Sequence, residues 1–190
     1  METADRYDVI VIGAGPGGFA AALGAARQGR RVLLVEQNSG PGGIAVFSGC
    51  PVFSGIASLE SEQYNSVTGA LIEELQKLDS AKIVGSTLTS SEAAVQLAMS
   101  RLLQKHGVKL LFYATLVGAE VRERRIESVQ VFCAGRHLSF SASAYIDASG
   151  DAVLAHLAGA EVICGTPEES MTRTVLFRLS NVKSFDKNSL

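Results

Sequence analysis

The chain has 190 residues, of which 47% are hydrophobic, and its formal net charge is −2 at pH 7. This length allows one domain and the start of another, and the small net charge without a basic block argues against a nucleic-acid partner. No apolar run is long enough to span a membrane, and the short N-terminal one, flanked by acids, is not expected to be a signal peptide.

The three cysteines are Cys50, Cys133 and Cys164, with no CxxC pair and no metal-ligand spacing among them. Sparse, unpaired cysteines are typical of a reducing compartment, so we expect a cytoplasmic protein without a metal site. Cys50 lies in the loop SGCPVFSG and is the one candidate for a catalytic thiol. No partner base or second cysteine stands near it in the sequence, and an inert thiol is the more common case. The catalytic residues are otherwise unknown.

The first 36 residues carry one ordered pattern. An apolar run at 9–12 is followed by GAGPGG at 13–18, an alanine-rich helical segment that ends near Gly29, an apolar run at 32–35 and then Glu36. Strand, glycine turn, helix, strand and acid together form the dinucleotide-binding βαβ fingerprint. We therefore predict an α/β, Rossmann-like fold with a parallel sheet.

Each part of this pattern has a physical role. Gly13 allows the tight turn, Gly15 lets backbone approach a pyrophosphate, and Gly18 lets the helix pack closely on the strands. Unpaired N–H groups at the helix start favour phosphate. Glu36 can accept hydrogen bonds from both hydroxyls of an adenosine ribose. It would repel a 2′-phosphate, and no arginine follows at the next two positions, so NADP is not expected.

The stretch from about 44 to 90 is expected to be a loop and helical insertion. Residues 38–56 are rich in Gly, Ser and Pro, which is typical of a loop. Gly42 and Gly43 within it offer a second close approach of backbone to a cofactor, or else a flexible turn.

Two helices are predicted after this loop. The first covers 59–78, the stretch 83–89 is ambiguous, and the second is capped by Ser90 or Ser91. It ends at His106, which suits a helix C-terminus better than catalysis.

Strands dominate the next part of the chain. The continuous apolar run 108–112 predicts a buried parallel strand. Three short runs follow at 115–121, 126–132 and 137–140, as in an antiparallel meander.

A second strand–glycine–helix junction lies at 143–160. Tyr145 and Ile146 end a strand, ASG makes the turn, and Asp151 is expected to cap the helix that follows. Its backbone can meet the cofactor beside the first junction. After it, 165–172 is expected to be a connector and 174–179 a strand.

The chain resembles the FAD-dependent oxidoreductases of the glutathione-reductase type, in their N-terminal portion. The resemblance rests on the opening DVIVIGAGPGGFAAALGAARQGRRVLLVEQ, the GG of GPGGIA, the strand and meander KHGVKLLFYATLVGAEV, and YIDASGDAVLAHLAGA. The later MTRTVLFRLSNV resembles that group's first substrate-domain strand. The meander would then replace a crossover helix.

The resemblance implies FAD as the cofactor, an FAD-binding domain over 1–164 and the start of an incomplete substrate domain over 165–190. Val117 would lie near the adenine through its backbone, and Gly150 and Asp151 near the flavin. The complete set of implied FAD contacts is Gly13, Gly15, Gly18, Glu36, Gly42, Gly43, Val117, Gly150 and Asp151.

Three functions stay open at this stage. The first is an FAD-dependent oxidoreductase, or its N-terminal part, with unknown small-molecule substrate and electron acceptor. Because members of the group are usually much longer, the second is the nucleotide-binding half of a split or truncated flavoprotein, inactive alone and completed by a partner chain or a homo-oligomer. The third is an NAD-binding Rossmann domain, although the meander and the IDASGD junction favour FAD.

Overall fold

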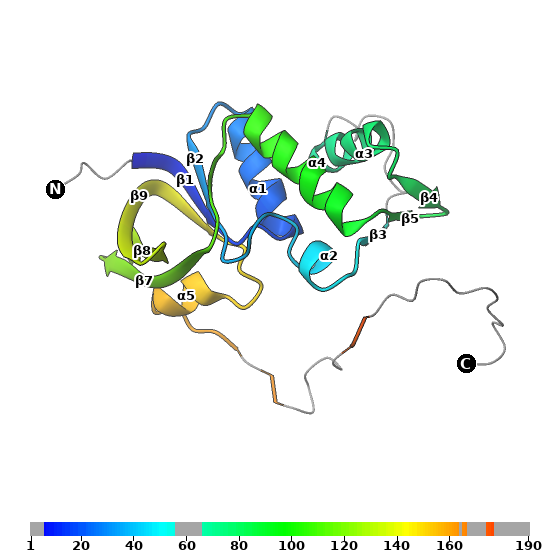
Figure 1. Cartoon of the computed structure of the whole chain (residues 1–190). Helices are drawn as coiled ribbons and strands as arrows, with labels where there is room; N and C mark the ends of the chain where they lie inside the picture. The colour runs from blue at the N-terminus through cyan, green and yellow to red at the C-terminus, as the bar shows by residue number, and fades with distance from the viewer. Residues whose placement is uncertain (1–5, 56–65, 164, 167–173, 177–190) are drawn as a thin grey trace.

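A mainly parallel sheet forms the centre of the molecule (Figure 1). The computed structural model describes residues 6–55, 66–163, 165–166 and 174–176, and within these ranges the sheet has six strands. In sheet order they are β6 (Lys109–Leu111), β2 (Val32–Val35), β1 (Arg6–Ile12), β9 (Arg136–Asp147), β8 (Arg125–Cys133) and β7 (Ala114–Arg122). The pairs β6–β2, β2–β1 and β1–β9 are parallel, whereas β9–β8 and β8–β7 are antiparallel. The predicted Rossmann-like fold with a meander crossover is confirmed.

The first βαβ unit forms where the sequence predicts it. α1 (Pro16–Arg27) connects β1 to β2, and Val9 pairs with Val32 at the start of their ladder. Gln28 and Gly29 end the helix, and Gly29 has a φ of +71°. Pro16 lies in the first turn of the helix, where its missing N–H leaves no hydrogen bond unmade.

The long strand β9 pairs with two different strands along its length. Its first residues pair with β8, with Phe140 opposite Val129, and its later residues run parallel to β1 as far as the pair Ile12 and Asp147. The sequence predicted two separate strands here, and the structure joins them into one. The chain thus returns from the meander to the middle of the sheet without a helix.

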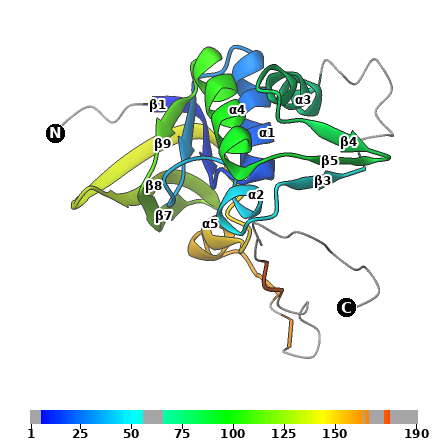
Figure 2. The same ribbon diagram turned by 45° about the vertical axis from the view of Figure 1, so that its right-hand side comes forward.

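Two hydrophobic cores lie on opposite faces of the sheet. Helices α1, α3 (Val67–Lys77) and α4 (Glu92–Lys105) cover one face, and the meander with α5 (Val153–Leu157) covers the other (Figures 1 and 2). Because successive side chains of a strand point to opposite faces, β2 supplies both cores. Val32 and Leu34 pack on the helices, while Leu33 and Val35 pack on the meander. Burial on both faces explains the continuous apolar run of β2.

The insertion has more regular structure than the sequence predicted. The expected loop 38–56 contains α2 (Ile44–Phe47) and β3 (Val52–Ser54). The ambiguous stretch 83–89 forms a hairpin of β4 (Lys82–Val84) and β5 (Thr87–Thr89). The strands β3, β5 and β4 make a small sheet that projects beyond the end of α4 (Figure 2).

The helix boundaries follow their caps. The Ser66 hydroxyl accepts a hydrogen bond from the N–H of Gly69 and opens α3, so this helix begins later than predicted, while 56–65 lie outside the described residues. Ser91 caps α4 by accepting from the N–H of Ala94 at 3.2 Å. His106 ends α4 as predicted, and its Nδ1 lies 2.9 Å from the carbonyl oxygen of Leu102 in the last turn of the helix.

Two strand predictions need correction. The run 108–112 gives only the short edge strand β6, where Lys109 is exposed and Leu110 and Leu111 are half-buried, because no strand covers its outer side within the described sheet. Residues 174–176 form no strand; most of 165–190, including the rest of 174–179, lies outside the described residues. Among the described residues, no helix has the length and apolar character needed to cross a membrane.

We expect Leu103→Ala to destabilise the protein by about 2–5 kcal/mol, because Leu103 is fully buried in the core between the helices and the sheet. The matched control is Leu97→Ala on the same helix, whose side chain is 43% exposed; its cost should be about 0.5 kcal/mol. Urea unfolding followed by circular dichroism measures both. Equal losses would contradict the assignment of this helix face to the core.

Candidate cofactor-binding site

The candidate site lies at the carboxyl ends of β1, β2 and β9. From β1 the chain continues to β2 on one side, whereas β9 lies on the other side of β1, so the strand order reverses between β1 and β9. In open α/β sheets ligands bind in the crevice at such a switch point. The segments that leave the strands here begin at Gly13, Glu36 and Ala148.

Backbone segments meet closely at Gly13. Its N–H donates to the carbonyl oxygen of Val35 at 2.8 Å, and the N–H of Ala148 donates to that of Ile12 at 2.8 Å. Gly13 has a φ of +92°, and a Cβ on it would clash with the carbonyl oxygen of Ala148. A Cβ on Gly18 would clash in turn with the carbonyl oxygen of Gly13. Glycine at both positions therefore permits the close helix packing that the sequence predicts.

The start of α1 faces this junction without a side-chain cap. Gly15 is the N-cap residue and provides no acceptor for the first N–H groups of the helix. The second glycine pair packs against it: Gly43 has a φ of +51°, and a Cβ there would be 2.8 Å from the Cα of Gly15. The N–H of Gly42 donates to the carbonyl oxygen of Ala14 at 2.8 Å. Uncapped N–H groups and bare backbone together form a cradle suited to a phosphate.

Glu36 is a buried carboxylate beside the glycine turn, with 5% of its surface exposed. Its Oε2 accepts from the N–H of Ala14 at 2.7 Å. Its Oε1 accepts from both the N–H and the side-chain Nδ2 of Asn38, at 2.7 and 2.8 Å. The carboxylate is thus fixed in place by three donors.

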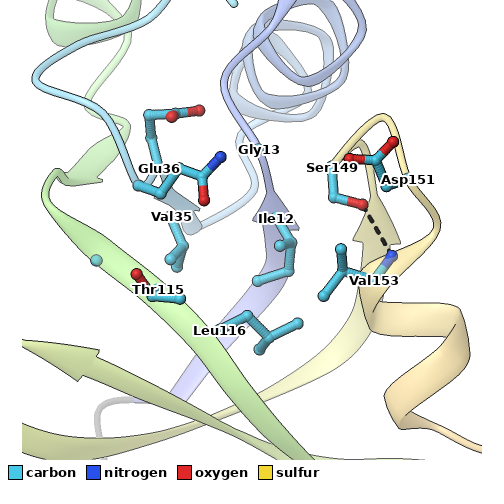
Figure 3. A pocket seen from close by; sticks show the side chains of 11 residues that line it. Ile12, Gly13, Val35, Glu36, Thr115, Leu116, Ser149, Asp151 and Val153 are labelled. Atoms are coloured by element: carbon cyan, nitrogen blue, oxygen red, sulfur yellow. Dashed lines mark hydrogen bonds between the residues drawn. The ribbon is translucent and has the colours of Figure 1, made fainter.

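Two adjoining cavities occupy the crevice. The first, of about 140 Å³, has an apolar floor of Ile12, Val35, Leu116 and Val153, with Glu36 at its upper edge (Figure 3). The second, of about 580 Å³, runs along the glycine turn and the start of α1. The residues that line both cavities are Gly13, Glu36, Gln37 and Ser149.

The second glycine junction is held by Asp147 and Ser149. Asp147 Oδ1 accepts from the N–H and the hydroxyl of Ser149, and its Oδ2 accepts from the N–H of Ala155 at 2.9 Å. The Ser149 hydroxyl accepts from the N–H of Val153 at 3.0 Å (Figure 3). The prediction that Asp151 caps this helix is therefore wrong. α5 begins two residues later, after Ala152 in the left-handed conformation with a φ of +54°.

These contacts set the charge state of Asp147. Burial alone raises the pKa of this carboxyl, but the hydrogen bonds from Ser149, Ala155 and Leu154 outweigh burial, and the pKa lies below its ordinary value of 3.8. Asp147 is ionised at neutral pH and holds the turn through charge-assisted hydrogen bonds.

The predicted site residues fall into three groups. Gly18 and Gly42 pack behind the glycine turn, and two others lie outside the cavity linings: Val117, 45% exposed on β7, and Cys50, half-buried after α2. The cavity wall on β7 is instead formed by the preceding residues Ala114, Thr115 and Leu116. Those that line the cavities are Gly13, Gly15, Glu36, Gly43, Gly150 and Asp151.

Sequence reasoning missed several polar residues of the site. Asp147 and Ser149 belong to the quoted IDASGD segment, and a search of that segment for caps other than Asp151 could have found them. Gln37 and Asn38 directly follow Glu36, which is the only signal for them. No sequence signal distinguishes Thr115, which belongs to the first strand of the meander.

The fold and this site define a dinucleotide-binding protein of Rossmann type, and comparison with known proteins gives the family. The sequence profile of the FAD dependent oxidoreductases matches residues 8–189. The chain belongs to this family, whose cofactor is FAD.

Curated relatives match over parts of the chain. Dihydrolipoyl dehydrogenase of Zymomonas mobilis is 37% identical over 113 residues, covering 57% of this chain and 23% of that enzyme. Soluble pyridine nucleotide transhydrogenase of Hahella chejuensis is 58% identical over 38 residues, covering 20% of this chain and 8% of that enzyme. The chain thus spans less than a quarter of the curated relatives that it matches.

Solved structures share the fold at low identity. The anhydrotetracycline hydroxylase OxyS of Streptomyces rimosus superposes with a TM-score of 0.63 at 17% identity, over 81% of this chain and 34% of that one. A geranylgeranyl bacteriochlorophyll reductase-like protein of Thermoplasma acidophilum gives a TM-score of 0.58 at 17% identity, over 84% and 44% of the two chains.

Replacing Asp147 tests the second junction. We expect Asp147→Asn to cost about 1 kcal/mol at pH 7, because the amide cannot accept from both Ser149 and Ala155 as the carboxylate does. The lowered pKa means that the stabilisation is present above the ordinary pKa and is lost as the pH falls through the folded-state pKa. The wild-type advantage should therefore shrink below pH 3.8.

Urea unfolding at pH 7 and in the acid range measures this advantage. Asp151→Asn is the control, because Asp151 makes no cap, and its cost should be about 0.5 kcal/mol or less. A larger loss of stability in Asp151→Asn than in Asp147→Asn would mean that Asp151 caps the helix after all.

We expect the substitution of glycine by alanine to change the stability in opposite directions at two positions, Gly13 and Gly24. We expect Gly13→Ala to destabilise by about 1 kcal/mol or more and to abolish nucleotide binding, because its φ of +92° and the Ala148 carbonyl leave no room for a Cβ. We expect Gly24→Ala, inside α1 with no atom within 4 Å of its added Cβ, to stabilise by about 0.5–1 kcal/mol. Thermal unfolding of both variants checks the signs; a neutral Gly13→Ala would refute the close junction.

Proposed function

We propose that this chain is the FAD-binding part of an oxidoreductase, in which the flavin takes a hydride or electrons from a small-molecule substrate and passes them on. The single observation that carries the proposal is the convergence at the β1–β9 switch point of an uncapped glycine turn and a buried carboxylate, Glu36. A phosphate group and a ribose are the ligands that these two features accept.

The residues present fit the group. The close approach of Gly43 to Gly15 leaves bare backbone where a side chain would block a pyrophosphate. Glu36 would receive the adenosine ribose, and the apolar floor with Leu116 would exclude water from the adenosine end. When bound, flavin supplies the redox chemistry, and the protein binds and orients it. We propose that Gly150 and Asp151, which line the cavities, also contact the cofactor. Gly18 and Gly42 would support the glycine turn from behind, and Val117, outside the cavity linings, would approach the adenine only through its backbone.

A second candidate is a nucleotide-binding half that is inactive until a partner chain or a second copy completes the substrate domain. Exposed apolar side chains on α2 favour it: Ile44, which lines the larger cavity, is 69% exposed, and Phe47 on the same helix is 43% exposed. Large exposed apolar side chains grouped beside a cavity suit a covering partner. The sparse cysteines support a cytoplasmic location for either candidate. The alternative of an NAD-binding domain is set aside, because the chain belongs to a family whose cofactor is FAD.

Titration of the purified chain with FAD, followed by flavin fluorescence, tests the proposal. We expect saturable binding of FAD, and failure to bind FAD would refute it. We expect Glu36→Gln to weaken FAD binding by roughly ten- to a hundredfold, because a charged acceptor is lost. FMN has no adenosine ribose, so its affinity should not change.

The matched control is Glu73→Gln on the outer side of α3, where the side chain is exposed. This variant should bind FAD like the wild type. An equal loss for FAD and FMN in Glu36→Gln would mean that Glu36 does not face the adenosine ribose.

A further inference from the structure

Glu36 has fewer free acceptor positions than the sequence suggests. A carboxylate oxygen accepts about two hydrogen bonds in its plane. Both positions on Oε1 are taken by Asn38, through its N–H and its Nδ2, and one on Oε2 is taken by the N–H of Ala14. One position on Oε2 is left. A ribose presents two hydroxyls, so this carboxylate alone cannot accept from both.

Asn38 supplies the missing acceptor. A carboxylate only accepts hydrogen bonds, so the Asn38 atom that contacts Glu36 must be the amide nitrogen, and the amide oxygen Oδ1 faces elsewhere. No hydrogen bond involves Oδ1 among the described residues. Asn38 is half-buried and lines the larger cavity beside Glu36. The backbone carbonyl oxygen of Asn38 accepts a hydrogen bond from the N–H of Tyr113 at 3.1 Å, which connects this turn to the segment that follows β6.

We propose that Asn38 shares the recognition of the adenosine ribose with Glu36: Oε2 of Glu36 accepts from one hydroxyl and Oδ1 of Asn38 accepts from the other. This rests on the proposed function, because it assumes that an adenosine ribose binds here. Asn38 then has two roles, as a donor that holds Glu36 and as an acceptor that contacts the ligand. The arrangement needs no movement of the buried carboxylate when the ligand binds.

Deoxy nucleotides distinguish the contributions of the two ribose hydroxyls to binding. The full chain is titrated with ADP, 2′-deoxy-ADP and 3′-deoxy-ADP by calorimetry, or by displacement of FAD. In the wild type each deoxy analogue should bind more weakly than ADP, because one protein acceptor loses its hydroxyl donor. The loss should be roughly two- to tenfold where that acceptor is neutral and more where it is charged. In Asn38→Ala the penalty for one hydroxyl should keep its size and the other should change. The second penalty vanishes, or it rises to the size for a charged acceptor if the Oε1 position freed by the loss of Nδ2 takes over that hydroxyl.

Two further variants sharpen the result. Asn38→Asp keeps an acceptor oxygen, so both penalties should remain, although ADP binds more weakly because two carboxylates repel. Asn38→Leu has no acceptor and nearly the same shape, and it repeats the test of Asn38→Ala if alanine unfolds the protein. Gln104→Ala, an exposed amide on α4, is the matched control and should behave like the wild type.

Each outcome decides the proposal. If both penalties keep their wild-type size in Asn38→Ala and Asn38→Leu, Asn38 does not contact the ribose. If both vanish, Asn38 acts only by positioning Glu36, and the shared recognition is wrong. A wild-type chain that binds FAD and ADP but shows no deoxy penalty overturns this inference alone, whereas a chain that binds neither overturns the proposed function with it.

Discussion

The steric contact at Gly13 governs the rest of the structure. There the carbonyl oxygen of Ala148 and the start of α1 approach one residue so closely that no side chain fits. Because of this contact, the ends of β1, β2 and β9 and the first turn of the helix open into one crevice. A larger residue would separate these segments and move the helix away from the sheet. The site therefore requires the absence of a side chain at Gly13 before its polar groups can be brought together.

The second junction reaches that contact only because β9 changes partners along its length. Its first part completes the meander, and its last part lies beside β1 and delivers Asp147 next to the glycine turn. A crossover helix in this place would cover the face of the sheet where the meander now packs. The meander instead brings Leu116 under the crevice, which gives the site an apolar floor. Leu116 is thus the part of the floor that a distant segment supplies, whereas Ile12 and Val35 directly precede Gly13 and Glu36 in the chain.

How much of this the sequence predicts depends on the range of the interactions. Gly13, Gly18 and Glu36 were predictable because their roles follow from one local βαβ pattern. The cap of α5 was not, since Asp151 is a good cap by type and the left-handed Ala152 moves the helix start beyond it. Val117 was placed only by the family resemblance, and the ladder of β7 has an irregularity between Leu116 and Gly118 that no alternation of residue types reveals. The short α2 lies in a loop too rich in glycine to be predicted as a helix.

The electrostatics of the crevice show why Glu36 can be buried at all. A buried carboxylate is costly unless donors compensate it, and here Ala14 and Asn38 provide three hydrogen bonds before any ligand is present. Two of these donors are backbone N–H groups, which cannot rotate away. A ligand hydroxyl then joins a hydrogen-bond network that is already ordered, so binding costs little free energy for ordering the carboxylate. The same donors leave few acceptor positions free, so the feature that fixes the carboxylate also limits what it can recognise alone.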